Sequence, residues 1–218
     1  MNLTDPIHEI VGVSCEENVK FLSDYSDVIL SDGTFAYAPK PFAQTYTIHV
    51  YHEGFNVHVS HFFFTSKEAV TYAAMWRLLK EVCEKKTKKE FNIKLLMVDF
   101  ESAVLKAARD VFPSAIIKGC RFHLGQSFFR KIQSMKKLRK CYLRNDTTDP
   151  AATEIKKWLQ MFFSLSYLPP EKIQDAFVEL FSMAPAFSEA TKFADYTEKK
   201  SSGMCADRFG RPEFGVRN

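Results

Sequence analysis

The sequence predicts an α/β protein built on a mixed five-stranded β-sheet, with an all-helical region at its C-terminal end. Three observations indicate this. Three strand-like segments follow one another closely at the start, which is typical of an antiparallel meander. Helix-like and strand-like segments then alternate to about residue 140. Beyond Asp149-Pro150 the apolar residues recur only at helical spacing.

The meander is expected over three segments. Residues 28–38 form the first strand, residues 44–52 the second and residues 55–64 the third. Glu53-Gly54 supplies turn chemistry between the second and third strands. Because strands joined by short connections usually pair with each other, these three should be neighbours in the sheet.

Alternating helices and strands are expected next. They are a helix opened by the capping-box pattern Thr65-Ser66-Lys67-Glu68, a strand over 93–100, a helix over 101–112, a strand over 115–118 and a helix over 123–140. A meander followed by helix, strand, helix, strand and helix is the succession of the ribonuclease H-like fold.

Changes in pattern along the chain suggest four segments. Residues 1–22 are a mixed lead-in, and residues 23–145 hold the ribonuclease H-like core. Residues 146–198 carry only helical periodicity. Residues 199–218 are polar and aperiodic, so we expect a poorly ordered tail.

The composition is that of a soluble globular protein. The chain has 218 residues, of which 46% are hydrophobic, enough for a substantial core. It has no apolar run of membrane-spanning length and no signal-peptide pattern, so we expect it in the nucleus or the cytoplasm and not in a membrane. Its five cysteines are scattered without a Cys-x-x-Cys pair, which fits a reducing compartment.

Two carboxylates stand at strand positions where a charge needs a reason. Asp32 lies inside the first expected strand, and Asp99 ends the fourth. A buried carboxylate costs several kcal/mol unless it is paired or binds a metal. In the predicted order these strands are neighbours, so the two acids could share Mg²⁺ or Mn²⁺, which take oxygen ligands. The alternative is that Asp32-Gly33 is a turn and that Asp99 caps the helix beginning at Glu101.

A basic segment follows the fifth expected strand. Between Arg121 and Arg144 there are eight cations and no Asp or Glu. Such a segment favours contact with the DNA backbone, although a solvated helix face is the alternative. The residues expected to bind DNA are Arg121, Arg130, Lys131, Lys136, Lys137, Arg139 and Lys140.

Histidine and cysteine residues offer weaker metal signals. Cys120 and His123 form a Cys-x-x-His pair without a second pair, whereas structural zinc takes four ligands, so we expect a structural role and no zinc. Residues three apart on a regular strand face opposite sides. His49 and His52 are therefore not expected to converge, and neither are His58 and His61.

Several motifs together resemble the transposase domain of Mutator-like elements (MULE), from about residue 20 to about residue 185. They are Asp32-Gly33-Thr34-Phe35, Ala38-Pro39, Gln44-Thr45-Tyr46-Thr47-Ile48-His49, Asp99-Phe100-Glu101, Phe112-Pro113, Gly119-Cys120-Arg121-Phe122-His123-Leu124-Gly125-Gln126 and Leu168-Pro169-Pro170. Each is short, but together they occur in the order found in that family.

The resemblance implies a ribonuclease H-like core that uses an Asp-Asp-Glu triad and divalent metal to cut and join DNA. Asp32 and Asp99 match the first two acids, and Cys120 with His123 matches a family motif. The third acid, a Glu, follows a helical insertion in the family. This sequence stops where the stretch before that Glu would begin, so we expect an incomplete triad. The other glutamates have no matching context: Glu179, Glu189, Glu198 and Glu213.

Two functions follow from the resemblance. The first is a transposase core for DNA transposition and recombination, located in the nucleus. The second is a catalytically inactive DNA-binding or protein-interaction module derived from one. Self-association is compatible with either function.

Overall fold

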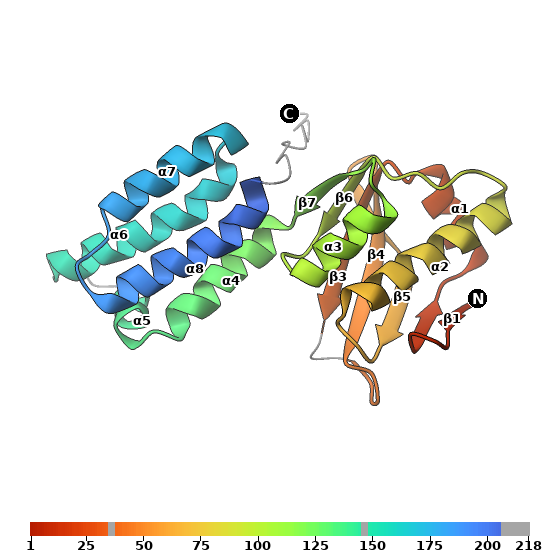
Figure 1. Ribbon diagram of the computed structural model, residues 1–218, viewed down its shortest axis with the longest axis horizontal. Coiled ribbons are helices and arrows are strands. Elements are labelled where there is room, and N and C mark those ends of the chain that lie inside the picture. Colours follow the sequence, from red (N-terminus) through yellow and green to blue (C-terminus); the bar gives the residue numbers. More distant parts are fainter. Residues whose placement is uncertain (35–37, 145–147, 206–218) are drawn as a thin grey trace. The chain divides into compact units, whose positions relative to one another are not determined.

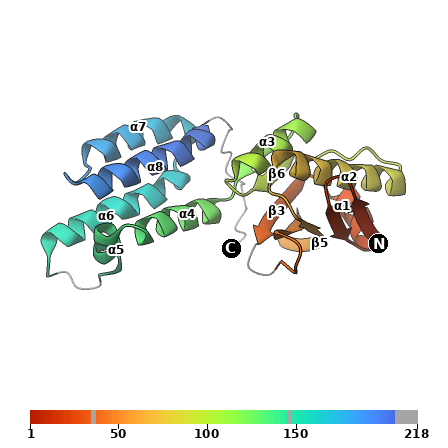
Figure 2. The ribbon, with the colours of Figure 1, turned by 60° about the horizontal axis from the view of Figure 1, so that its bottom comes forward.

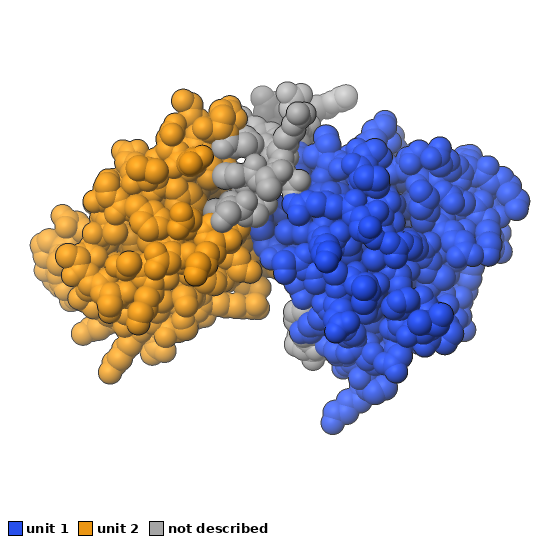
Figure 3. Space-filling model, viewed as in Figure 1, with its two compact units in different colours: residues 1–119, 213–218 blue, residues 120–212 orange. Residues whose placement is uncertain are grey.

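The computed structural model describes residues 1–34, 38–144 and 148–205 (Figure 1). The chain divides into two compact units, which Figure 3 shows in different colours. Unit 1 contains Met1–Gly119, and unit 2 contains the described residues from Cys120 onward. The division falls at Gly119 and Cys120, whereas the sequence suggested limits at 23–145 and 146–198. Among the described helices, none has both the length and the apolar character to cross a membrane.

Unit 1 contains one mixed sheet of seven strands in the order β1-β2-β5-β4-β3-β6-β7. The strands are β1 Asn2–Asp5, β2 Ile10–Val13, β3 Val28–Thr34, β4 Gln44–His52, β5 Phe55–Phe64, β6 Leu95–Val98 and β7 Ile116–Gly119. Strands β3, β4 and β5 form the predicted antiparallel meander, and β3, β6 and β7 run parallel.

The sheet has two strands more than the five that the sequence predicted. Residues 1–22, expected as a lead-in, contribute β1 and β2, which form a hairpin paired with the edge of β5. Each of these strands has only four residues, too few to show a clear alternation. Ile10 of β2, which pairs with Phe64 of β5, is buried, and so is Leu3 of β1; this burial stabilises the two strands.

The helices of unit 1 are α1 Glu16–Asp24, α2 Ala69–Thr87 and α3 Ser102–Val111. Figure 2 shows α2 and α3 over the same face of the sheet, where they bury the core side chains of the strands. The predicted capping box before α2 is absent. Glu68 is the N-cap but makes no side-chain capping bond, and the Thr65 hydroxyl donates to the Glu9 carboxylate instead.

A β-bulge interrupts the pairing of β4 with β5. Ile48 pairs with Ser60, but the next residue, His49, pairs with His58, so that Val59 is extra on β5. Val59 and Ser60 are both buried although they are consecutive. The buried Ser14 hydroxyl donates a 2.7 Å hydrogen bond to the Val59 carbonyl oxygen. The bulge therefore reverses which face of the sheet the preceding residues of β5 occupy.

Unit 2 consists of helices. They are α4 Arg121–Gln133, α5 Lys136–Leu143, α6 Pro150–Ser164, the 3-10 turn η1 Leu165–Tyr167, α7 Pro170–Ser182 and α8 Ser188–Cys205. Phe128 of α4, Trp158 and Phe162 of α6 and Phe193 of α8 pack together in its core. Helix α8 includes residues 199–205 of the expected tail, and residues 206–218 lie outside the described part of the chain.

The predicted single helix over 123–140 is two helices, because Met135 has an extended backbone between α4 and α5. The Glu189 carboxylate of α8 accepts hydrogen bonds of 3.0 and 3.1 Å from the backbone N–H groups of Lys137 and Leu138. A carboxylate at a helix N-terminus satisfies otherwise unpaired N–H groups, so Glu189 stabilises the start of α5.

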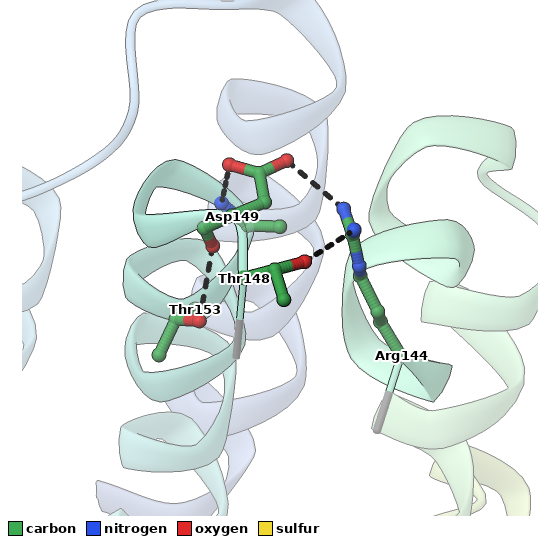
Figure 4. Close-up of polar contacts among 5 residues, drawn as sticks. Arg144, Thr148, Asp149 and Thr153 are labelled. Atoms are coloured by element: carbon green, nitrogen blue, oxygen red, sulfur yellow. Dashed lines mark hydrogen bonds and ion pairs between the residues drawn. The ribbon is translucent and has the colours of Figure 1, made fainter. Parts of the chain in front are cut away.

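The start of α6 is fixed by Asp149, as Figure 4 shows. Its side chain accepts a 3.2 Å hydrogen bond from the backbone N–H of Ala152, and Pro150 occupies the first turn. Arg144 donates to the Asp149 carboxylate at 3.0 Å and to the Thr148 hydroxyl at 3.3 Å. These contacts connect the end of α5 to the cap of α6.

Candidate functional site

Of the two aspartates singled out in the sequence, Asp32 lies within β3 and Asp99 directly follows the neighbouring strand β6. Parallel pairing between β3 and β6 ends with Leu30 beside Met97. Two residues further along this register, Asp32 in β3 corresponds to Asp99, which directly follows β6. Asp32 also pairs with Thr47 of β4, so it is part of a strand and not of a turn.

A buried polar network lies next to this pair of carboxylates. The hydroxyls of Ser31 and Tyr46 share a 2.8 Å hydrogen bond. Burial raises the pKa of the Tyr46 hydroxyl, and the negative charges of Asp32 and Asp99 raise it further despite the opposing effect of the Ser31 bond.

A second part of the network connects Gln44 to Glu101. The Gln44 amide donates to the Tyr72 hydroxyl at 2.8 Å, and this hydroxyl donates to a Glu101 carboxylate oxygen at 3.1 Å. Burial raises the pKa of Tyr72, and the charges of Glu101 and Asp99 add to this effect, whereas the Gln44 hydrogen bond opposes it. The tyrosines therefore remain neutral hydrogen-bonding groups near the acids.

Asp99 does not cap α3, which was the alternative for this residue. Its carboxylate accepts a 2.6 Å hydrogen bond from the backbone N–H of Phe100, and the N-cap of α3 is Glu101, which makes no side-chain capping bond. Sequence reasoning treated Glu101 only as part of a motif. Its place beside Tyr72 depends on packing between α2 and the start of α3, which no local pattern reveals.

Hard divalent cations fit the donor set of Asp32 and Asp99, because both supply carboxylate oxygens. In the described part of the chain, however, no group of three or more His, Cys, Asp or Glu side chains is already gathered around one point. The glutamates considered as substitutes for a third acid are not in unit 1: Glu179 is in α7, Glu189 and Glu198 are in α8, and Glu213 lies outside the described residues.

Cys120 and His123 lie at the start of α4, where Cys120 is the N-cap. Burial raises the pKa of the Cys120 thiol, but hydrogen bonds and the charge interaction with His123 outweigh burial, so the net shift is downward. The thiol and the imidazole therefore interact with each other, and the Cys120 thiol loses its proton more readily than that of an ordinary cysteine.

The basic residues expected to bind DNA lie on α4 and α5 and divide into two groups. Three lie over aromatic rings within unit 2: Arg121 over Tyr167, Lys131 over Tyr196 and Lys137 over Phe187, at 4.1, 5.1 and 3.9 Å. The other four are exposed: Arg130, Lys136, Arg139 and Lys140. Of these, Lys136, Arg139 and Lys140 share one face of α5, opposite the buried Leu138.

The histidines of β4 and β5 correct a prediction. His58 and His61 were expected on opposite faces, but the bulge at Val59 brings their ring centroids to 5.4 Å. His49, across from His58 in β4, has its ring centroid 5.1 Å from that of His58. Residues three apart lie on opposite faces only in a regular strand, and the extra residue Val59 breaks that regularity between His58 and His61.

Comparison with known protein families finds a match for the segment from β3 to α4. Residues 28–127 match the family model of the MULE transposase domain. The match starts at β3 and ends within α4, so this MULE domain includes Asp32, Asp99, Cys120 and His123. The resemblance seen in the sequence motifs is confirmed.

Among solved structures, the "Drosophila P element transposase strand transfer complex" is similar, with a TM-score of 0.30 and 10% sequence identity over 84% of this chain. The chain that carries the MULE domain spans about half, 51%, of that protein's chain. No curated protein matches this sequence.

Proposed function

We propose that the chain is a transposase-derived domain that binds the DNA backbone and keeps part of a metal site for DNA cleavage and strand transfer, within a ribonuclease H-like core. The observation that carries this proposal is the parallel pairing of β3 with β6, because the same register continued by two residues sets Asp32 opposite Asp99. The MULE match over the same residues supports it. The strand order β5-β4-β3-β6-β7 supports the assignment of the core.

In this proposal Asp32 and Asp99 supply oxygen ligands to Mg²⁺ or Mn²⁺. A bound divalent cation would polarise a phosphate oxygen and stabilise charge that develops during phosphoryl transfer. The pairing of Asp32 with Thr47 of β4 fixes its backbone, and Asp99 directly follows β6, which pairs with β3. Tyr46 and Tyr72 stay protonated beside them and add no negative charge.

An inactive DNA-binding or protein-interaction module is the second candidate. It is favoured by the lack, within the described residues, of three metal-ligating side chains around one point. Two carboxylates alone bind Mg²⁺ or Mn²⁺ weakly, because such ions prefer six oxygen ligands and are released easily when water supplies most of them. A nuclear location and self-association stay predictions.

Metal binding by the aspartates can be tested by titrating the full chain with Mn²⁺ and following free Mn²⁺ by electron paramagnetic resonance. We expect weak, saturable binding that Asp32→Asn/Asp99→Asn abolishes. Asp175→Asn, an exposed change on α7, is the matched control and should leave the titration unchanged. Equal binding by the double variant and the unaltered chain would refute the metal site.

DNA binding can be tested by measuring affinity for a duplex of arbitrary sequence over a range of salt concentrations. Because each phosphate contact contributes a slope of about −0.9 to the dependence of log K on log salt, Lys136→Gln/Arg139→Gln/Lys140→Gln should reduce the slope by up to about three. The control with equal charge change in unit 1 is Lys86→Gln/Lys89→Gln/Lys94→Gln, which should have little effect. An affinity insensitive to salt would contradict the proposal.

A further inference from the structure

The bulge in β5 creates a cluster of imidazoles that a regular strand would not have. His49 lies between Ile48 and Val50, which are buried in the core, so its side chain faces the opposite side of the sheet. His58 pairs with His49 and faces the same side. Because Val59 is the extra residue, His61 returns to that side as well. Three histidines from two strands thus share one exposed face of unit 1.

The ring distances within two pairs, His49 with His58 and His58 with His61, fit the sharing of one metal ion. Zinc lies about 2.0–2.1 Å from an imidazole nitrogen, and with a ring radius of about 1.1 Å, two imidazoles on one tetrahedral ion have centroids about 5.2 Å apart. The centroids of His49 and His58 are 5.1 Å apart, and those of His58 and His61 are 5.4 Å apart. Both pairs of rings have interplanar angles of 68°.

Binding requires rotation of side chains. The ligating nitrogens do not yet point at one place, since the described residues hold no preformed group of three metal ligands. His58 is exposed, and His49 and His61 are half-buried, so their rings have room to turn. His58 and His61 also line an open cavity of about 500 Å³ next to Cys15 and Asn18, which gives an ion and its water ligands access.

Electrostatics favour the neutral, metal-binding form of His49 and His61. Burial lowers the pKa of His49, and the neighbouring His58 and His61 lower it further, although Asp32 opposes this. Burial and His58 also lower the pKa of His61. These residues are therefore mainly neutral at pH 7, and neutral imidazole is the metal ligand.

We propose that His49, His58 and His61 form a binding site for a borderline-soft divalent cation such as Zn²⁺, Ni²⁺ or Cu²⁺, centred on His58. Imidazole nitrogen suits these ions, whereas Mg²⁺ and Mn²⁺ prefer the oxygen ligands of Asp32 and Asp99. The site uses other side chains than the proposed acid site, although Asp32 acts on the charge of His49, and it does not depend on the chain having transposase activity.

Isothermal titration calorimetry of the full chain with Zn²⁺ at pH 7.5 tests the proposal. We expect saturable binding that His58→Gln weakens by at least about tenfold, since loss of outer-shell partners alone costs 10–100-fold in metal affinity. His8→Gln is the matched control, because His8 lies on the β1–β2 connection beside Asp5 and outside the cluster. It should keep the affinity within about twofold of the unaltered chain.

Cys120→Ser/His123→Asn separates this site from zinc binding at the start of α4. Unchanged binding in this variant together with loss in His58→Gln supports the proposal. Unchanged binding in His58→Gln, absence of saturable binding to the unaltered chain, or loss only in Cys120→Ser/His123→Asn overturns it. Asp32→Asn/Asp99→Asn should keep its zinc affinity, so failure of the acid site and failure of the histidine site remain distinguishable. Circular dichroism confirms that each variant is folded.

Discussion

The two units of the chain build their cores in different ways. Unit 1 joins strands that are far apart in sequence, such as β3 and β6, and places polar groups such as Ser31, Tyr46 and Gln44 in its interior. Unit 2 packs helices around aromatic side chains, with Trp158 against Phe162 and Phe193. Buried polar side chains need defined partners, whereas apolar rings need only close packing. The candidate chemistry of unit 1 therefore depends on register, and the stability of unit 2 depends on ring contacts.

The largest expected effect comes from the tryptophans, because each unit has one. Trp158 is buried in unit 2, and its indole N–H donates to the Leu180 carbonyl at 2.9 Å. Trp158→Ala should destabilise unit 2 by about 3–5 kcal/mol. In this variant Trp76 of α2 is the remaining tryptophan, so its fluorescence reports unit 1 alone.

We expect thermal unfolding followed by circular dichroism to shift to lower temperature, while the transition followed by Trp76 fluorescence stays in place. Equal shifts of both signals would mean that the two units unfold together, which would contradict the view that each unit is stabilised by its own core. Trp76→Phe, which leaves only Trp158, gives the complementary measurement of unit 2.

A pair of glycine substitutions should have opposite signs in the two units. A Cβ at Gly119, in β7, would lie 2.2 Å from a Phe100 ring carbon, so the ring must move. Gly119→Ala should therefore destabilise unit 1 by about 1–3 kcal/mol, which is typical of overpacking. Urea denaturation measures the change.

Gly125→Ala is the counterpart in unit 2. Gly125 lies inside α4, and a Cβ there would meet the Phe163 ring at an ordinary contact distance of 3.6 Å. Because alanine favours a helix interior over glycine, this change should stabilise unit 2 by about 0.5–1 kcal/mol. A destabilising Gly125→Ala, or a neutral Gly119→Ala, would show that packing around these positions differs from the structure.

The smallest effect concerns the thiols. Burial raises the pKa of Cys83 in unit 1 to about 11, opposed in part by a Ser23 hydrogen bond, whereas His123 lowers the pKa of Cys120 in unit 2. Iodoacetamide should therefore modify Cys120 before Cys83 at pH 7.5, because the thiolate is the reactive form. Peptide mass spectrometry over time gives the two rates.

His123→Asn should raise the pKa of Cys120, so that its alkylation slows by up to about tenfold at pH 7.5 and the pH profile moves to higher pH. The rate at Cys83 is the internal control. A Cys120 rate unaffected by His123→Asn would show that the imidazole does not stabilise the thiolate.

Local sequence patterns predicted the features that repeat regularly. Alternation of apolar residues located β3, β4 and β5, and an apolar segment located β6. Asp32 lies inside β3 and Asp99 directly follows β6, as the strand-like segments around them indicated. Sequence alone could not test whether the acids bind metal or the basic helices bind DNA.

Features that depend on distant contacts were missed. The sequence around Val59 contains no glycine or other residue that would indicate a bulge. The contact at this position comes from Ser14, whose hydroxyl donates to the Val59 carbonyl oxygen. The break between α4 and α5 is stabilised by Glu189, some fifty residues away. The short strands β1 and β2 gain their stability from the edge of β5.

The hydrogen bond from Ser14 to Val59 gives the N-terminal hairpin an influence on the opposite surface of the sheet. Without it, β5 could slide by one residue into an uninterrupted ladder with β4, and side chains before the slip would exchange sides. The hydrogen bond from Ser14 thus helps to set the register of β5, a strand that begins about forty residues later in the chain.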